Sequence, residues 1–111
     1  MTISTVLYPP PPPGSTPFDI TYYLKTHMPL VTKLFSPFGL VKWEVIQFSS
    51  PDGAAPAFVV QTILHWESDE GMAKANASEA GKTLGDDIKN FSVTMPVGVG
   101  GKVVGEEKVG R

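Results

Sequence analysis

His27 is the residue of this chain best placed for acid–base chemistry, because it lies within an apolar helical pattern. At about 100° per residue, the large apolar side chains between residues 20 and 35 fall on one face, with His27 near its centre. Burial disfavours a charged imidazole, so His27 would stay neutral at neutral pH and could take a proton from a phenol or an acidic carbon and return it. A purely structural histidine, hydrogen-bonded to Tyr23 or to a carbonyl freed by Pro29, is the alternative.

Two tyrosines precede this histidine and could orient a substrate oxygen or an enolate. Tyr23 lies one turn before His27 on the same face and is the second catalytic candidate. Tyr22 points about 100° away from Tyr23, near the edge of that face. We predict a role for Tyr22 in substrate binding, with ordinary aromatic packing as the alternative.

Three further candidates for substrate binding lie on predicted strands. Gln61 and His65 are an even number of positions apart, so they share one face of a strand. Polar groups in an enclosed interior need partners, and a ligand can supply them. Trp43 offers a stacking surface for an aromatic substrate, with core packing as the alternative.

Composition argues against several classes of function. The chain has no cysteine, so no disulfide, thiolate metal site or cysteine nucleophile is expected. His27 and His65 have no carboxylate at ligand spacing, so no metal is predicted, and no glycine motif for phosphate precedes a helix. Eleven acidic and nine basic residues, without a basic cluster, do not indicate nucleic-acid binding. Neither a metal nor a nucleotide cofactor is therefore expected. We expect no membrane partner and a cytoplasmic location, since no signal peptide or long apolar run is visible.

The elements that must position these residues follow from local patterns. Pro29 should kink the first helix, because proline lacks the N–H and crowds the preceding turn. We interpret the proline-rich residues 9–16 as a stiff connector rather than a ligand for a proline-binding module. The whole chain, 1–111, forms one predicted domain with a frayed tail at 105–111. Strands are predicted at residues 2–8, 40–48, 57–66 and 91–104, and helices at 20–35 and 68–84.

The order of these elements, βαββαβ, predicts an α+β, ferredoxin-like fold, in which a four-stranded antiparallel sheet carries two helices on one face. The other face would expose Val59, Ile63 and the neighbourhood of Trp43. An apolar surface of that size is typically buried against another molecule rather than exposed to water. The simplest such partner is the same sheet of a second copy of the chain. We therefore expect a homodimer, a dimeric α/β barrel, with His27 facing the hollow between the two sheets.

One segment of the chain resembles the signature of the EthD family. In residues 18–30 it reads Phe-Asp, two residues, Tyr-Tyr, three residues, His, one residue and Pro-Leu, and every fixed position matches. The resemblance extends over roughly residues 5–104, including Val6-Leu7-Tyr8-Pro9, the loop at 51–56 and Asn90-Phe91. It implies a dimeric α/β barrel that acts on small hydrophobic or aromatic compounds, often without a cofactor.

These observations lead to one main hypothesis and two alternatives. The main one is a cofactor-independent enzyme for a hydrophobic, aromatic, polyketide-like substrate, an oxygenase or a decarboxylase, with His27 as acid and base. Such an EthD-like protein would be a monooxygenase-type oxidoreductase or a lyase of secondary metabolism. The alternatives are a non-catalytic carrier of an apolar metabolite, and an interaction module whose interior is filled by side chains. A cavity beside His27 would favour the first two.

Overall fold

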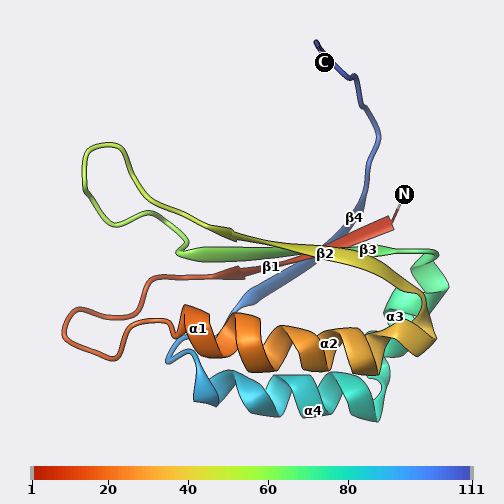
Figure 1. Cartoon of the computed structure of the whole chain (residues 1–111), viewed down its shortest axis with the longest axis horizontal. Coiled ribbons are helices and arrows are strands. Elements are labelled where there is room, and N and C mark those ends of the chain that lie inside the picture. The colour runs from red at the N-terminus through yellow and green to blue at the C-terminus, as the bar shows by residue number, and fades with distance from the viewer. Residues whose placement is uncertain (1, 111) are drawn as a thin grey trace.

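The computed structural model describes residues 2–110 of the chain. A four-stranded antiparallel sheet forms one layer, and the helices form a second layer against one of its faces (Figure 1). The predicted α+β architecture is therefore confirmed, whereas pairing of two sheets stays a prediction. In chain order the elements are β1 (Thr2–Tyr8), α1 (Ile20–Tyr22), the π-helical turn η1 (Tyr23–His27), α2 (Met28–Phe35), the 3-10 turn η2 (Ser36–Phe38), β2 (Leu40–Gln47), β3 (Val60–Trp66), α3 (Asp69–Ala77), α4 (Glu79–Asp87), the 3-10 turn η3 (Ile88–Asn90) and β4 (Val97–Lys102).

The strands lie in the order β2-β3-β1-β4, so β1 pairs with both β3 and β4. Alternation along β3 separates the two faces of the sheet. Its even-numbered residues are buried beneath the helices, and its odd-numbered residues lie on the face that no helix covers, here called the open face. The register places Ile3, Leu7, Ile46, Ile63, Val97 and Val99 on the open face.

The first helical segment contains a π-helical turn just before Pro29. Asp19 caps its start by accepting a hydrogen bond of 3.0 Å from the Tyr22 N–H. The Met28 N–H then donates to the Tyr23 carbonyl, five residues back. Pro29 cannot donate to the Lys25 carbonyl, and this wider turn accommodates the missing bond. The irregularity caused by the proline therefore takes the form of η1, which carries both Tyr23 and His27.

The single helix predicted at 68–84 is wrong, because Ser78 divides it into α3 and α4. Ser78 has extended backbone angles and caps α4 by accepting a 3.2 Å hydrogen bond from the Gly81 N–H. Gly81 allows this close junction, since a Cβ there would lie 2.7 Å from the Asn76 carbonyl oxygen. The second of these helices, α4, ends at Asp87, three residues beyond the predicted end at residue 84.

The last strand is shorter than the predicted 91–104, since β4 covers only Val97–Lys102. Phe91 instead joins a cluster of aromatic rings under the sheet, 4.8 Å between centroids from Tyr23 and 5.7 Å from Tyr8. Ser92 is buried and hydrogen-bonds to Thr94, which in turn bonds to the Pro9 carbonyl. These hydrogen bonds stabilise the segment that connects η3 to β4.

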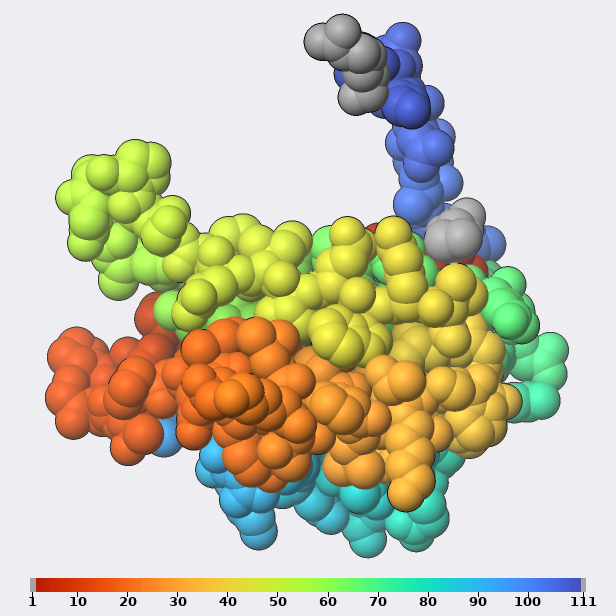
Figure 2. All heavy atoms as spheres, in the orientation of Figure 1, coloured from red at the N-terminus to blue at the C-terminus, as the bar shows by residue number. Residues whose placement is uncertain are grey.

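Three segments project from the packed layers, one of them the loop of residues 48–59 between β2 and β3 (Figure 1). Residues 9–18 form an irregular connector between β1 and α1, and residues 103–110 leave the sheet as extended chain (Figures 1 and 2).

Trp43 does not lie on the open face as expected. It pairs with Leu64 on the helical side, and its Nε1–H donates to Thr32 Oγ1 at 2.8 Å.

Candidate active site

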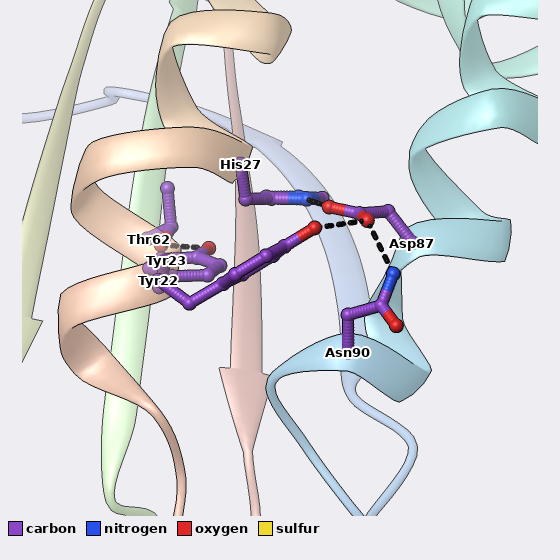
Figure 3. Close-up of polar contacts among 6 residues, drawn as sticks. All are labelled: Tyr22, Tyr23, His27, Thr62, Asp87 and Asn90. Atoms are coloured by element: carbon purple, nitrogen blue, oxygen red, sulfur yellow. Dashed lines mark hydrogen bonds and ion pairs between the residues drawn. The ribbon is translucent and has the colours of Figure 1, made fainter.

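The polar centre of the molecule is a histidine–aspartate pair joining the two helical segments. His27 comes from the π-helical turn η1, and Asp87 is the last residue of α4. His27 Nδ1 lies 2.9 Å from Asp87 Oδ2, and the histidine is only 5% exposed (Figure 3). Two segments distant in the sequence therefore meet at one buried contact.

Three hydrogen bonds hold the Asp87 carboxylate. Oδ1 accepts from the Tyr22 hydroxyl at 2.6 Å and from Asn90 Nδ2 at 2.8 Å, while Oδ2 faces His27 (Figure 3). Burial on its own would raise the pKa of Asp87, but the bonds from Tyr22, Asn90 and His27 outweigh it and leave the pKa below its ordinary value. Asp87 is therefore an anion at neutral pH, and the same contact raises the pKa of the Tyr22 hydroxyl.

The charge of Asp87 determines which nitrogen of His27 carries the proton. Burial lowers the pKa of His27 below its ordinary value of 6.5, and this effect outweighs the opposing influence of Asp87. At neutral pH the ring is therefore neutral and has one N–H. An ionised carboxylate only accepts hydrogen bonds, so the proton must be on Nδ1. The basic lone pair is then on Nε2, the ring atom that makes no hydrogen bond with any described residue.

Tyr23 fixes the plane of the imidazole. Its ring stacks on that of His27 with 5.2 Å between centroids and 14° between planes. Its hydroxyl bonds to Thr62 Oγ1 on β3 at 2.6 Å, deep in the core. Burial raises the pKa of Tyr23, so the hydroxyl stays protonated. Tyr23 therefore supports one face of the His27 ring and stays protonated at neutral pH, so it does not act as a base there.

A cavity of about 430 Å³ lies beside His27, between the helical layer and the sheet. The expectation that His27 faces a hollow between two sheets is therefore wrong: its hollow lies inside one chain, on the helical side. No lining residue is Asp, Glu, Lys or Arg, so a charged ligand would find no ionic partner there. The walls are mainly apolar and come from β1, the first helical segment, β3, α4 and β4, with Val6, Tyr23, Met28, Leu64, Leu84 and Gly98 among them.

The structure does not bring all the predicted residues together. His27 and Tyr23 line the cavity, whereas Tyr22 is not among the lining residues and bonds to Asp87, the partner of His27. Gln61 and His65 lie on the open face, where Gln61 donates to Thr5 Oγ1 at 2.8 Å. His65 Nε2 lies 2.8 Å from Glu44, and its buried Nδ1 has no hydrogen-bond partner among the described residues.

Trp43 is likewise not among the cavity residues, since it packs at the outer side of α2 through Thr32. A role for Trp43, Gln61 or His65 in binding therefore stays a prediction that would need a ligand outside this cavity. For Gln61 and His65, that place is the open face.

Asp87 is the functional candidate that sequence reasoning missed. Its pattern carried a signal, because Asp86 and Asp87 end a helix whose last turn holds no basic residue. Carboxylates at a helix C-terminus face the negative end of the helix dipole, so they need a partner elsewhere. The sequence did not show which residue pairs with Asp87, because His27 lies 60 positions away in the chain.

Two further searches of the described residues bear on function. Within residues 2–110, no three His, Asp or Glu side chains gather as a candidate metal site. In the same part of the chain, no helix has the length and apolar character needed to cross a membrane.

The fold and the site define a class: a ferredoxin-like α+β domain with a histidine–aspartate pair beside an apolar cavity. The resemblance of this chain to EthD proteins is confirmed by solved structures. An EthD-like protein from Ralstonia eutropha JMP134 has a TM-score of 0.79 and 29% identity, covering 96% of this chain and 95% of that one. An ethyl tert-butyl ether D (EthD) family protein from Bacillus halodurans C-125 has a TM-score of 0.70 and 25% identity, covering 92% and 97%.

The wider likeness concerns the fold alone. A dimeric ferredoxin-like protein from Jannaschia sp. CCS1 has a TM-score of 0.65 and 9% identity, covering 92% of this chain and 98% of that one. A scan against protein-family models finds no match, and a search of the curated proteins finds none either.

Proposed function

We propose that this protein is a cofactor-independent enzyme that acts on a small hydrophobic, aromatic, polyketide-like molecule by acid–base chemistry at His27. One observation carries the proposal: a neutral imidazole, oriented by an anionic carboxylate, forms part of the wall of an apolar cavity. Perturbed titratable groups beside a cavity are typical of catalytic sites. The likeness to EthD proteins supports a role in small-molecule chemistry.

The proposed reaction begins with proton transfer to His27 Nε2. A bound phenol or an acidic C–H gives up its proton, which leaves a phenolate or an enolate and an imidazolium. Asp87 stabilises the imidazolium through the Nδ1–H bond, in the way a carboxylate supports histidine in other acid–base sites.

In the oxygenase reaction the carbanion forms a C–O bond with dioxygen, the imidazolium protonates the outer oxygen, and the resulting hydroperoxide loses water to leave a ketone, so the substrate itself supplies the electrons. A β-keto acid bound in its neutral form passes its carboxyl proton to His27 Nε2. Cleavage of the C–C bond then releases carbon dioxide and leaves the enolate, and the imidazolium returns the proton to its carbon.

The test compares two histidines on opposite faces of the same sheet. His27→Asn removes the base, whereas His65→Asn removes an imidazole that lies outside the cavity. Anthrone, with anthraquinone as its oxidised product, probes oxygenation, and benzoylacetate, with acetophenone as its product, probes decarboxylation. We expect the wild type and H65N to accelerate one reaction above background, and H27N to lose about 10²-fold or more. Equal rates in folded H27N and wild type would disprove the role of His27.

A carrier of an apolar metabolite is the second candidate function. The observation in its favour is that the hydroxyls of Tyr22 and Tyr23 are both used in internal bonds. Few polar groups are then left to act on a ligand. The carrier hypothesis predicts binding of these aromatic probes without turnover, and nearly unchanged affinity in H27N.

We propose further that two copies pair through their open faces. Ile3, Leu7 and Ile63 lie half-buried at the centre of this face, and Val97 and Val99 are about half exposed beside them. Such an apolar surface is typical of an interface. A twofold pairing would bury it against an identical surface, and the dimeric ferredoxin-like protein from Jannaschia shares this fold.

A further inference from the structure

The edge strand β4 presents glycines where it passes over the cavity. Gly98 pairs with Val6 and Gly100 with Ser4, two residues of β1 that line the cavity on the helical side of the sheet. Val97 and Val99, which alternate with these glycines, pair with Leu7 and Thr5 on the open face, and Val99 also lies at the edge of the cavity. On the side that faces the helices, these two positions therefore carry no side chain of their own: Met72 of α3 packs against Gly100, since a Cβ there would lie 3.2 Å from its Cε, whereas a Cβ at Gly98 would meet nothing.

The fold itself does not require glycine at two of the positions that line the cavity. A Cβ at Gly98 on β4 or at Gly85 on α4 would meet no described atom within 4 Å. Neither residue has a positive φ angle. By contrast, a Cβ at Gly81 would lie 2.7 Å from a backbone oxygen. Glycine in a strand or helix costs stability relative to alanine, so Gly85 and Gly98 call for an explanation other than packing.

The position of these two glycines relative to His27 supplies that explanation. Both line the cavity and both are exposed, whereas His27 is buried in its wall. The cavity therefore runs from a buried polar end at His27 to an opening between α4 and β4. A side chain at Gly98 would lie on the helical side of β4, over this opening, and one at Gly85 would enter open space at its rim.

We propose that Gly85 and Gly98 are specificity-determining residues that admit a flat, uncharged, multi-ring ligand, edge first, between α4 and β4. The single polar group of this ligand, a hydroxyl or an enolisable ketone, reaches His27, and its apolar rings lie beneath Gly98 of β4. The absence of charged residues from the cavity wall argues against a carboxylate or phosphate on the ring body. This inference rests on the proposed function and names the size and shape of the substrate.

The first test fills the opening from the strand side. Gly98→Val adds a side chain over the cavity, and Gly101→Val adds the same side chain to the same strand on the open face, where a Cβ also meets nothing within 4 Å. The probes are phenol and 2-naphthol, and binding is measured by calorimetry. We expect G98V to weaken 2-naphthol binding about tenfold or more and phenol binding less than about threefold. G101V should bind both probes like the wild type.

The second test fills the opening from the helix side and does not depend on β4. Gly85→Leu is compared with Thr83→Leu, an exposed position on the same helix. G85L should discriminate against 2-naphthol as G98V does, and it should melt at or above the wild-type temperature because leucine favours the helix. A loss of both probes together with a lower melting temperature would point to a structural defect and overturn the inference.

The remaining outcomes separate this inference from the proposed function. Unchanged 2-naphthol affinity in both folded variants overturns the role of the glycines and leaves the role of His27 standing. A wild type that binds neither probe overturns both. Loss of 2-naphthol binding in G98V and G85L, with phenol binding kept, supports the inference even if His27 turns out to have no catalytic role.

Discussion

Tyr22 and His27 hold the two oxygens of one carboxylate: the Tyr22 hydroxyl lies 2.6 Å from Asp87 Oδ1, and His27 Nδ1 lies 2.9 Å from Oδ2. Because both oxygens are engaged, Asp87 cannot rotate without losing a hydrogen bond. The imidazole is thereby held with Nδ1 as donor and Nε2 as base. The orientation of His27 in the cavity wall thus depends on a carboxylate of α4 that does not itself line the cavity.

Replacing Asp87 should slow turnover and move the pH profile. Asp87 raises the pKa of His27 against the effect of burial, so Asp87→Asn should lower that pKa further and loosen the ring. We expect the rate to fall about 10- to 100-fold, less than the loss on removing His27 itself, with the acid limb of the rate profile at lower pH. Asp86→Asn, the adjacent exposed carboxylate, is the matched control. An unshifted acid limb in D87N would contradict this role.

Folding stability should fall as the solution is acidified from neutral pH. Burial holds the pKa of His27 below 6.5, so the unfolded chain binds a proton more readily than the folded one. This contribution is complete above pH 6.5 and is lost as pH falls through the lower, folded pKa. Asp87, whose folded pKa lies below 3.8, adds a second loss at lower pH. Melting temperatures of wild type and H27Q between pH 7.5 and 4.5 test this, because H27Q should lack the first loss.

Two glycines on α4, one turn apart, should respond to alanine with opposite signs. Gly81→Ala places a Cβ 2.7 Å from the Asn76 carbonyl oxygen, and such overpacking costs about 1–3 kcal/mol. Gly85→Ala meets nothing within 4 Å and should stabilise the protein by about 0.5–1 kcal/mol through helix propensity. Urea unfolding measures both. A stabilised G81A would mean that the junction of α3 and α4 is looser than described.

The buried bond between Tyr23 and Thr62 should behave as a coupled pair. Each single variant, Tyr23→Phe or Thr62→Val, leaves one buried hydroxyl without its 2.6 Å partner, at a cost of about 1–3 kcal/mol. The double variant removes both hydroxyls and should cost less than the sum of the two single changes. Urea unfolding of all four proteins gives the coupling energy, and strictly additive losses would rule the bond out as a stabilising contact.

A charge on the open face should separate the proposed dimer. Ile63→Lys puts an ammonium group at the centre of that face, whereas Leu24→Lys changes an exposed apolar residue on the first helical segment. Sedimentation should give a dimer for the wild type and L24K and a monomer for I63K, since an unpaired charge is costly to bury. A dimeric I63K would place the interface elsewhere.

The outline of the fold could be predicted from the sequence because its signals are local. The apolar residues of β1 and β3, the Asp19 cap and the apolar face around His27 are all short-range patterns. Ser78, which divides the second helix, was overlooked although serine is a common N-cap. Pro29 indicated an irregular helix, but not that a π-helical turn would absorb it.

The candidate site was less accessible to sequence reasoning because it depends on long-range contacts. His27, Tyr23 and Tyr22 could be found, since one helix carries them all. Their acid, Asp87, comes from a helix end that only the packing of α4 beside the first helical segment brings near. The position of the cavity was also out of reach, because it depends on how far α4 stands from the glycines of β4.

The alternation of glycine and valine in β4 gives the two faces of this strand different roles. Gly98 leaves room beneath the edge of the sheet, and the valines supply surface to the opposite side. A descendant of this sequence can therefore narrow its opening by a change at this one residue, while its contacts on the far side stay as they were.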